Sequence, residues 1–350
     1  MSAEAGHDAA RDAGAASDRV LALLREHTLV SGEELSQRLG VSRAAIWKRI
    51  EQLRARGYRI EARHARGYRL VGAPDRLLPA EIARHLATAW VGRRIVAFET
   101  TDSTNVQAAR LARAGAPAGT LVVAERQTHG RGRLGRRWIS PPRVNLYASV
   151  VLRPALAPVD APQLGLAAAV AVARALAPLA PGRVAIKWPN DCLLDGRKVA
   201  GILTEMDAEL DRVRWVVLGI GVNLNAAARA LPPALRRTAT SVAIATGRRV
   251  DRAAFAAALC DAFEAVYDRL AREGFAALLP EWEALSCLTG REVTVDGAGR
   301  RRTGRVRGLD ARGRLLLAGP EGEERIVAGD VTVVGGYGGL GATPGGSSHG

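Results

Sequence analysis

Hydrophobic residues near the start of the chain recur at helical spacing in three short segments. Asp18, Ser31 and Ser42 precede these segments, and both residue types are favoured at helix N-caps because their side chains accept hydrogen bonds from free backbone amides. Gly40 ends the second segment, so only a short turn separates it from the third, which runs to residue 56. The spacing predicts three helices, of which the last two form a helix-turn-helix.

Two segments of alternating hydrophobic and polar residues follow, at 58–61 and 67–71. Alternation on both sides of a short link predicts a β-hairpin, so we expect a winged helix-turn-helix domain over residues 18–73. Trp47, on the third helix, is expected to pack against this wing, with contact to DNA as the alternative.

Between about residues 75 and 285 the pattern changes to hydrophobic strands that alternate with helices. This order predicts a domain of the α+β class, in which helices flank a mixed sheet. Strands are predicted at 94–99, 121–125, 145–152, 184–187, 199–206 and 213–222, and helices at 82–86, 104–114, 163–179 and 255–270.

The C-terminal segment 288–334 shows four or five short alternating stretches linked by Gly-rich turns, which predict a small SH3-like β-barrel. The end segments 1–17 and 335–350 are small, polar or Gly-rich, and we expect them to be mobile tails. No stretch suggests a membrane span, so no membrane contact is expected.

Composition adds a large positive charge to this picture. The 350 residues include 50 Lys and Arg against 35 Asp and Glu, a formal net charge of +15. Such an excess predicts a polyanionic partner. Only three of the basic residues are lysines, so these positions are candidates for specific roles: Lys48, Lys187 and Lys198. Three cysteines cannot form a paired framework, which fits a reducing compartment and a cytoplasmic protein.

Part of the charge lies on the helix-turn-helix and its wing. Residues 42–71 include nine basic and two acidic residues. A recognition helix reads base edges while flanking cations contact phosphates. A protein-binding winged helix with a solvated basic face is the alternative, but the complete motif together with the charge asymmetry favours DNA. The predicted DNA contacts are Ser42, Arg43, Lys48, Arg49, Arg63 and Arg66.

A second cationic segment lies between two apolar strands, at residues 127–138 (QTHGRGRLGRRW). Its glycines allow close backbone approach to a ligand, and its arginines suit phosphate or carboxylate. The segment lacks the Gly-Lys-Ser/Thr ending of a Walker loop. An RGG-like nucleic-acid segment is the alternative, although the position between strands favours a folded site.

Further polar motifs follow strand ends or open a helix. Lys187 begins the run Lys-Trp-Pro-Asn-Asp, and Lys198 precedes Gly201 at the start of another strand. The run 219–225 (GIGVNLN) ends a strand, and 101–105 (TDSTN) opens a helix. Each has an ordinary structural reading as a turn or a helix cap. His129 has no partner ligands at recognisable spacing, so no metal site is predicted.

Taken together and in this order, these motifs resemble those of biotin protein ligases. The resemblance covers about residues 95–225 and rests on Ser103-Thr-Asn, Gly130-Arg-Gly-Arg, Lys187-Trp-Pro-Asn-Asp, Lys198 with Gly201, and Gly219-Ile-Gly-Val-Asn. With the winged helix in front, the whole chain is similar to the bifunctional type that is both biotin ligase and biotin-operon repressor.

The resemblance implies a two-step reaction. Biotin and Mg-ATP give biotinyl-5′-adenylate and pyrophosphate, and the biotinyl group then passes to a lysine of the biotin carboxyl carrier protein of acetyl-CoA carboxylase. It also implies operator DNA as a partner, and a homodimer of the adenylate-bound form is possible.

Specific residues inherit roles from the resemblance. Arg133, Lys187 and Lys198 would be catalytic. The implied biotin site is Ser103, Thr104, Asn105, Gln127, Arg131, Gly132, Arg133, Lys198 and Gly201, and the implied nucleotide site is Arg131, Arg136, Trp138, Lys187, Asn190 and Asn223. Two other functions are weighed against this one: a ligand-sensing transcription factor without ligase activity, and a lipoate-type ligase on the related fold.

Overall fold

The computed structural model describes residues 16–63, 66–297, 299–320, 322–334 and 336. The chain forms two compact units, residues 1–75 (unit 1) and 76–350 (unit 2). The predicted mobile tails, 1–17 and 335–350, lie almost wholly outside the described residues.

Unit 1 holds the predicted helix-turn-helix. Residues 16–26 are helical, followed by α2 (Gly32–Leu39) and α3 (Arg43–Ala55). Ser31 and Ser42 cap α2 and α3 as predicted, and Gly40 ends α2 in the left-handed region at φ 63°. The prediction that Asp18 caps the first helix is wrong, because the helix has already begun at residue 16. Asp18 instead pairs with Arg56 at 2.8 Å.

The wing is a hairpin of β1 (Arg59–Arg63) and β2 (Gly67–Gly72), which pair antiparallel. Leu35, Ile46 and Ile50 are buried and form part of the hydrophobic core of the unit. Trp47 does not join them: its side chain is 59% exposed, so the prediction that it packs against the wing is wrong. Ile46 and Ile50 occupy the buried face of α3, and Trp47 lies outside that face.

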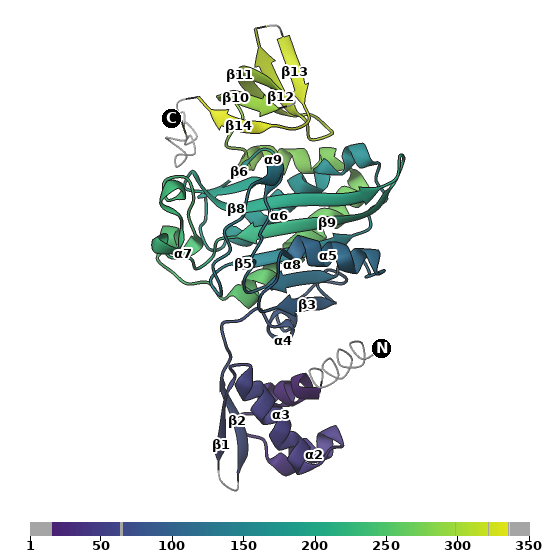
Figure 1. Cartoon of the computed structure of the whole chain (residues 1–350), viewed down its shortest axis with the longest axis vertical. Helices are drawn as coiled ribbons and strands as arrows, with labels where there is room; N and C mark the ends of the chain where they lie inside the picture. The colour runs from purple at the N-terminus through teal and green to yellow at the C-terminus, as the bar shows by residue number, and fades with distance from the viewer. Residues whose placement is uncertain (1–15, 64–65, 298, 321, 335, 337–350) are drawn as a thin grey trace, which may run out of the picture. The chain divides into compact units, whose positions relative to one another are not determined.

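Unit 2 is built on a seven-stranded mixed sheet with the strand order β3-β4-β5-β9-β8-β7-β6 (Figure 1). Only the pair β3–β4 is parallel among the pairs of this sheet. The strands are β3 (Ile95–Phe98), β4 (Leu121–Ala124), β5 (Leu146–Leu152), β6 (Val184–Lys187), β7 (Asp191–Leu194), β8 (Arg197–Ala208) and β9 (Val213–Val222). Strand β7 was not predicted, since the motif before it was interpreted as a simple turn.

Helices cover both faces of this sheet. Helix α5 (Thr104–Arg113) packs on one face with Val122, Val151 and Val217, while α6 (Pro162–Leu176) and α8 (Arg252–Glu273) pack together against the other face. The first predicted helix, 82–86, is displaced toward the N-terminus and is found as α4 (Pro79–Ala83), because Pro79 sets the first turn.

The prediction that no stretch suggests a membrane span needs correction. The stretch Pro158–Leu176, which includes α6, is long and apolar enough to cross a membrane by length and composition. However, 78% of that window is buried within the fold, as expected of a core helix.

The C-terminal part of unit 2 is a five-stranded antiparallel sheet with the order β13-β12-β11-β10-β14, as the predicted small barrel requires (Figure 1). Its strands are β10 (Glu292–Gly297), β11 (Arg300–Leu309), β12 (Leu315–Gly319), β13 (Gly322–Ile326) and β14 (Asp330–Val333). The remaining short elements are α7 (Val242–Thr246), α9 (Leu279–Leu285) and the 3₁₀ turns η1 (Arg133–Gly135), η2 (Pro158–Asp160), η3 (Ala228–Ala230), η4 (Pro233–Leu235) and η5 (Phe275–Leu278).

Candidate active site and nucleic-acid interface

A cavity of about 890 Å³ opens on the sheet of unit 2, between the cationic segment 127–138 (the Gly-rich loop), the β6–β7 hairpin and the start of β14. Every residue predicted to bind biotin or nucleotide lines it. These residues are Ser103, Thr104, Asn105, Gln127, Arg131, Gly132, Arg133, Arg136, Trp138, Lys187, Asn190, Lys198, Gly201 and Asn223. Segments more than 100 residues apart in the chain are therefore brought to one place.

The floor of the cavity consists of glycine positions on β8 and β9. A Cβ atom at Gly221 would lie 2.6 Å from the Trp138 indole, and one at Gly201 would lie 2.9 Å from the same ring. A side chain at either position would therefore displace Trp138. The strand glycines let the indole of the Gly-rich loop lie directly against the sheet.

The polar end of the cavity is built at the start of α5. The side-chain oxygen of Gln127 accepts hydrogen bonds from the Thr104 backbone amide at 2.8 Å and the Thr104 hydroxyl at 3.1 Å. Asn105 is buried and donates to the Glu205 carboxylate at 2.8 Å. Ser149, which is fully buried on β5, lies within hydrogen-bonding distance of both Thr104 and Asn105.

Three of the four arginines of the Gly-rich loop have partners outside the loop. Arg131 pairs with Glu205 at 2.9 Å, and Arg133 donates to the side-chain oxygen of Asn190 at 3.1 Å. Arg136 pairs with Asp330 at the start of β14. The loop is thereby attached to the sheet, to the β6–β7 hairpin and to the C-terminal sheet at three different points.

The two lysines of unit 2 line the cavity from β6 and β8, the strands on either side of β7. The Lys198 ammonium lies 2.6 Å from the Asp191 carboxylate and 5.5 Å from the centre of the Trp138 ring. Burial lowers the pKa of Lys187 below its ordinary value, an effect that the nearby Asp191 opposes. Burial likewise lowers the pKa of the Arg133 guanidinium, again opposed by Asp191. Positive charge is thus concentrated at one wall around a single carboxylate.

The end of β9 is held by amide side chains. Asn223 lines the cavity, and its side chain accepts from Asn145 and donates to the Thr240 carbonyl, both at 3.1 Å. Lys198 bonds through its backbone to Thr238 and Thr240. Both strand ends therefore hold the segment around residue 240 in place.

The sequence did not predict the wall formed by the segment after β9. Its cavity-lining residues are Leu231, Leu235, Arg237, Thr238 and Ala239, and Leu235 is exposed. No aromatic residue marks this segment in the sequence, which carries two leucines in an Ala- and Pro-rich run. Glu205 and Ser149 were missed as well, because nothing local distinguishes a Glu or a Ser within a strand pattern.

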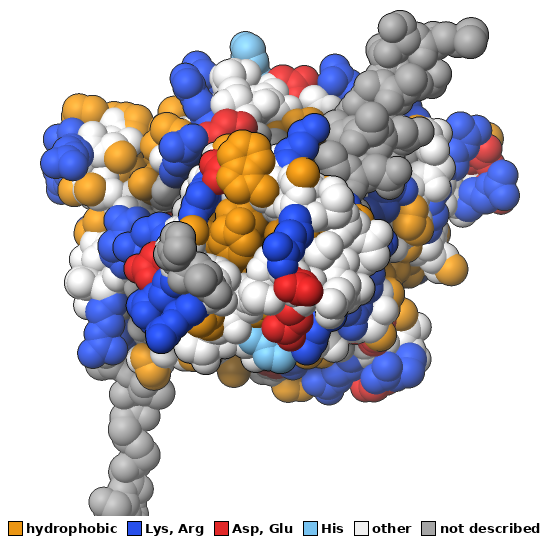
Figure 2. Space-filling view, turned by 90° about the horizontal axis from the view of Figure 1, so that it is seen from below, with side chains coloured by type: hydrophobic (Ala, Val, Ile, Leu, Met, Phe, Trp, Pro, Cys, Tyr) orange, Lys and Arg blue, Asp and Glu red, His pale blue; other side chains and the backbone are white. Residues whose placement is uncertain are grey.

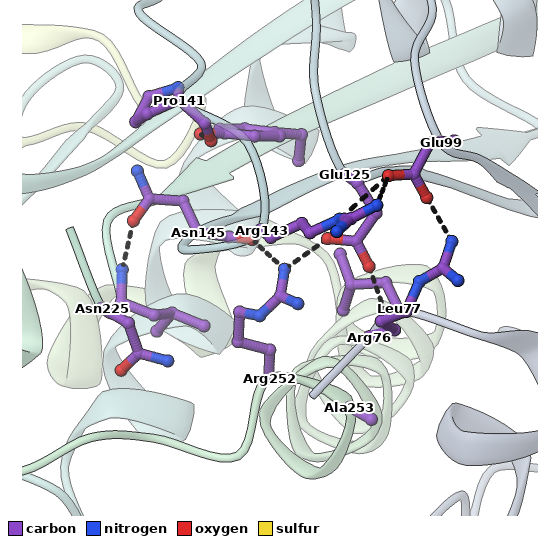
Figure 3. A network of polar contacts seen from close by, with 12 residues as sticks. Arg76, Leu77, Glu99, Glu125, Pro141, Arg143, Asn145, Asn225, Arg252 and Ala253 are labelled. Atoms are coloured by element: carbon purple, nitrogen blue, oxygen red, sulfur yellow. Dashed lines mark hydrogen bonds and ion pairs between the residues drawn. The ribbon is translucent and has the colours of Figure 1, made fainter. Parts of the chain in front are cut away.

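A buried polar network lies behind the site (Figure 3). The Glu125 carboxylate accepts from the Leu77 backbone amide at 2.7 Å and pairs with Arg252 at 2.7 Å. Arg252 has no exposed surface, and it also donates to the Asn145 carbonyl at 3.3 Å. Because Gln127 follows Glu125 closely and Asn145 contacts Asn223, this network supports the cavity both at Gln127 and at Asn223.

Within the described ranges of the chain, no group of three or more His, Cys, Asp or Glu side chains is placed to hold a metal ion. The carboxylates that line the cavity are Asp191, Asp195 and Asp330.

The predicted DNA contacts lie on the surface of unit 1. Ser42 serves as the N-cap of α3 through its side chain, which accepts from the Ala45 amide. Arg43, Lys48, Arg63 and Arg66 are exposed, and Arg49 is half-buried. The Arg43 guanidinium forms an ion pair with the Glu33 carboxylate at 2.6 Å. Figure 2 shows a molecular face on which Lys and Arg side chains are widely spread and hydrophobic side chains are exposed among them.

Comparisons with known proteins agree with this division. Residues 97–223 match the model of the biotin/lipoate A/B protein ligase family, residues 17–69 match an HTH domain, and residues 288–334 match the biotin protein ligase C terminal domain.

Similar proteins include two described as bifunctional ligase/repressor BirA. The protein of Bacillus subtilis is 40% identical over 302 residues, covering 86% of this chain and 93% of that protein. The protein of Escherichia coli is 34% identical, covering 85% and 91%. Among solved structures, the biotin protein ligase from Aquifex aeolicus in complex with biotin and ATP matches with a TM-score of 0.60 and 29% identity, over 69% of this chain and 99% of that one.

Proposed function

The chain belongs to the family of bifunctional biotin ligases and repressors, and from this premise we propose how its two units perform the two activities. Unit 2 is an ATP-dependent biotin ligase that acts on a carboxyl carrier protein, and unit 1 is the DNA-binding part of a repressor. The observation that carries the proposal is that one cavity gathers all the residues whose motifs identify the ligase.

We assign the ureido ring of biotin to the polar end of the cavity, because protein hydroxyl and amide groups gather there. Thr104 and Gln127 present oxygen and nitrogen atoms there, and Trp138 offers an apolar surface against the strand glycines. A small number of placed polar groups within an apolar surface is what a small-molecule site requires. The valeryl chain of biotin would then lead its carboxylate toward Lys198.

The cationic wall suits the first step of the reaction. Attack of a carboxylate on the α-phosphate of ATP brings two anions together, and fixed cations offset this repulsion as charge spreads in the transition state. We assign the reacting carboxylate and phosphate to Lys198, and the other phosphates to Arg133 and Lys187. Asp191 holds the Lys198 ammonium in position before ligands bind.

We assign the adenine to the wall of Leu231 and Leu235, since these apolar lining residues belong to the segment that follows the strand end at Asn223. Arg131 and Arg136 would contact the adenylate from the Gly-rich loop. Asn223 uses one acceptor site and one donor site of its side chain to hold the segment around residue 240, and it would contact the nucleotide through the remaining ones.

Mg²⁺ fits this site as an ion that ATP brings with it. Protein-bound Mg²⁺ commonly uses one or two carboxylates together with substrate phosphates, and Asp191 is available in the cavity lining. The ion would neutralise phosphate charge. Chelation of free Mg²⁺ should stop adenylation while biotin alone still binds, as measured by calorimetry.

The test of the ligase is direct. The purified chain is incubated with biotin, Mg-ATP and a biotin carboxyl carrier domain, and the mass of the carrier is measured. We expect one biotinyl addition that depends on ATP. No addition would leave the ligand-sensing transcription factor as the better reading, and modification with lipoate in preference to biotin in a competition would favour the lipoate-type ligase.

For DNA, we propose that the exposed cations of α3 and the wing contact operator phosphates. The logarithm of the binding constant should fall with the logarithm of the salt concentration by about 0.9 per phosphate contact. A response that is flat in salt would contradict groove binding. Because helix-turn-helix proteins commonly bind paired half-sites as dimers, we also propose a homodimer of the adenylate-bound form in the cytoplasm. Sedimentation with and without biotin and ATP would test it.

A further inference from the structure

Four side chains at the polar end of the cavity form a continuous hydrogen-bonded chain, Glu205–Asn105–Ser149–Thr104. The separations are 2.8 Å from Asn105 to Glu205, 2.6 Å from Ser149 to Asn105 and 2.8 Å from Ser149 to Thr104. Asn105, Ser149 and Thr104 are all buried. Because each hydroxyl has a single proton, the direction of donation along this chain can be worked out.

Glu205, at the outer end of this chain of hydrogen bonds, fixes the orientation of the Asn105 side-chain amide. One end of the Asn105 side-chain amide faces the Glu205 carboxylate at 2.8 Å and the Leu203 carbonyl at 3.4 Å, and both of these groups only accept. That end must therefore be the NH₂ group, and the oxygen must face Ser149. A Cβ atom at Gly219 would lie 2.1 Å from this oxygen, so the glycine leaves room for the amide in this orientation.

The orientation of Asn105 determines which acceptor receives the Ser149 hydroxyl proton. The Asn105 oxygen accepts, so the Ser149 hydroxyl donates to it and can only accept from Thr104. The other neighbour of the Thr104 hydroxyl is the Gln127 oxygen at 3.1 Å, which also only accepts. The orientation of Gln127 is fixed in turn, because its oxygen accepts from the Thr104 amide and its NH₂ group faces Ser140 at 3.1 Å.

Both partners of the Thr104 hydroxyl inside the protein are therefore acceptors, and its single proton is directed to one of them. Toward the cavity Thr104 presents lone pairs only. We propose that Glu205 and Ser149 are positioning residues that make Thr104 an obligate hydrogen-bond acceptor, and thereby select a ligand that offers an N–H group at this point. This inference rests on the proposed function, because it assigns the ureido ring to the polar end.

The same arrangement gives Asn105 a positioning role. Its NH₂ group faces Glu205 and Leu203, and its oxygen faces Ser149, so its polar atoms are occupied within the protein. Asn105 thus transmits the orientation set by Glu205 and does not itself need to contact the ligand. Glu205 additionally holds Arg131 of the Gly-rich loop at 2.9 Å, which joins the loop to the same chain.

Glu205→Gln is the informative variant, because a Gln side chain can donate as well as accept. The Gln amide can donate to an Asn105 oxygen turned toward residue 205, and this turn gives up only the long 3.4 Å contact to the Leu203 carbonyl. Ser149 can then donate to Thr104, so the Thr104 proton is no longer taken by Ser149 and becomes available to the ligand. Glu209→Gln is the matched control. Glu209 makes the same kind of exposed ion pairs with Arg212 and Arg214 outside the chain of hydrogen bonds.

The probes are biotin and two analogues in which one or the other ureido N–H is replaced by oxygen, and the measurement is kcat/KM for adenylate formation by pyrophosphate release. For the wild type, we expect at least one analogue to be roughly 10- to 100-fold poorer than biotin, since two acceptors would face each other. Glu205→Gln should reduce this discrimination about tenfold, and Glu209→Gln should leave it unchanged. Discrimination in Glu205→Gln equal to that of the wild type overturns the proposal.

Ser149→Ala supplies a second, independent measurement. Without Ser149 the Thr104 hydroxyl loses its acceptor at 2.8 Å and keeps only the 3.1 Å contact to the Gln127 oxygen, which already accepts from the Thr104 amide, so the discrimination should fall as in Glu205→Gln. The KM for biotin should rise several-fold, with the KM for ATP and the kcat at saturating biotin unchanged. An unchanged KM for biotin would remove Ser149 from the site. Failure of the wild type to form adenylate from biotin itself would refute the proposed function instead, and would be visible before any variant is compared.

Discussion

The two units of this protein use positive charge in opposite ways. In the ligase cavity the cations are held by particular oxygen atoms: Lys198 by Asp191, Arg133 by Asn190 and Arg131 by Glu205. On the DNA-binding unit the predicted contact residues Lys48, Arg63 and Arg66 are exposed on α3 and the wing. Chemistry on a phosphate requires a fixed charge at a fixed point, whereas a phosphate backbone requires only a field of sufficient density.

The same difference explains the use of lysine. Arginine is the general cation of this chain, yet two of its three lysines face the cavity and the third lies on α3. The ammonium group is a compact point charge that can approach a reacting oxygen closely, while the guanidinium is a planar fork that suits bidentate pairing. Substitutions of these cations test whether fixed and diffuse charge are separable.

The strongest test of a fixed charge is the buried Arg252. Arg252→Met leaves the Glu125 carboxylate buried without its ion-pair partner, and the loss of one member of a buried pair typically costs roughly 3–5 kcal/mol of unfolding free energy. Arg174→Met is the matched control, because Arg174 pairs bidentately with Glu281 at a partly exposed site and should cost about 1 kcal/mol or less. Urea unfolding measures both, and equal losses would contradict the special role of the buried network.

The second test compares the loss of one lysine in the cavity with the loss of one lysine on α3. Lys198→Ala should lower kcat for adenylate formation by about 10²–10³, the usual cost of removing one fixed stabilising group from a transition state. Lys48→Ala should leave that rate unchanged and weaken DNA binding instead. Pyrophosphate release measures the first property and duplex titration the second. An effect of Lys48→Ala on adenylation comparable with that of Lys198→Ala would end the separation of the two roles.

These outcomes depend on features that the sequence reveals unequally. The helix-turn-helix and the strands of the mixed sheet follow from local periodicity and caps, as Ser31, Gly40 and Ser42 illustrate. The motif residues of the cavity were predicted because their spacing resembles a family pattern, and the fold brings them together. Glu205, Ser149 and Arg252 had no such signal, since each acts through a partner at least 44 residues away in the chain.

The errors have physical reasons as well. Strand β7 was missed because the turn residues Pro189 and Asn190 were interpreted as the end of a strand, whereas they connect two paired strands. Trp47 was expected to be packed because a large apolar side chain normally gains by burial. Its exposure follows from helical geometry: Ile46 and Ile50 occupy the buried face of α3 and direct position 47 outward.

That exposure leads to a smaller prediction on the DNA side. An apolar side chain in the major groove can contact the methyl group of thymine. Trp47→Ala should weaken binding to duplexes selected from a random pool by the wild type about tenfold, with the salt slope unchanged because tryptophan carries no charge. Lys48→Ala should reduce the slope by about 1. Fluorescence anisotropy at several salt concentrations separates the two, and equal slopes for both variants would mean that Lys48 contacts no phosphate.

The smallest expected effect concerns pH. Burial lowers the pKa of Lys187, so the Lys187 charge is lost at a lower pH than that of an exposed lysine. If this charge assists adenylation, the rate should decline on the alkaline side as the ammonium deprotonates. Lys187→Arg keeps its charge throughout and should move that decline to higher pH, even though its different shape lowers the rate several-fold at neutral pH. The ratio of rates at pH 9.5 and 7.5 measures the shift. Lys48→Arg, outside the cavity, should leave the ratio at the wild-type value, and a Lys187→Arg profile that follows the wild type would show that the alkaline decline belongs to another group.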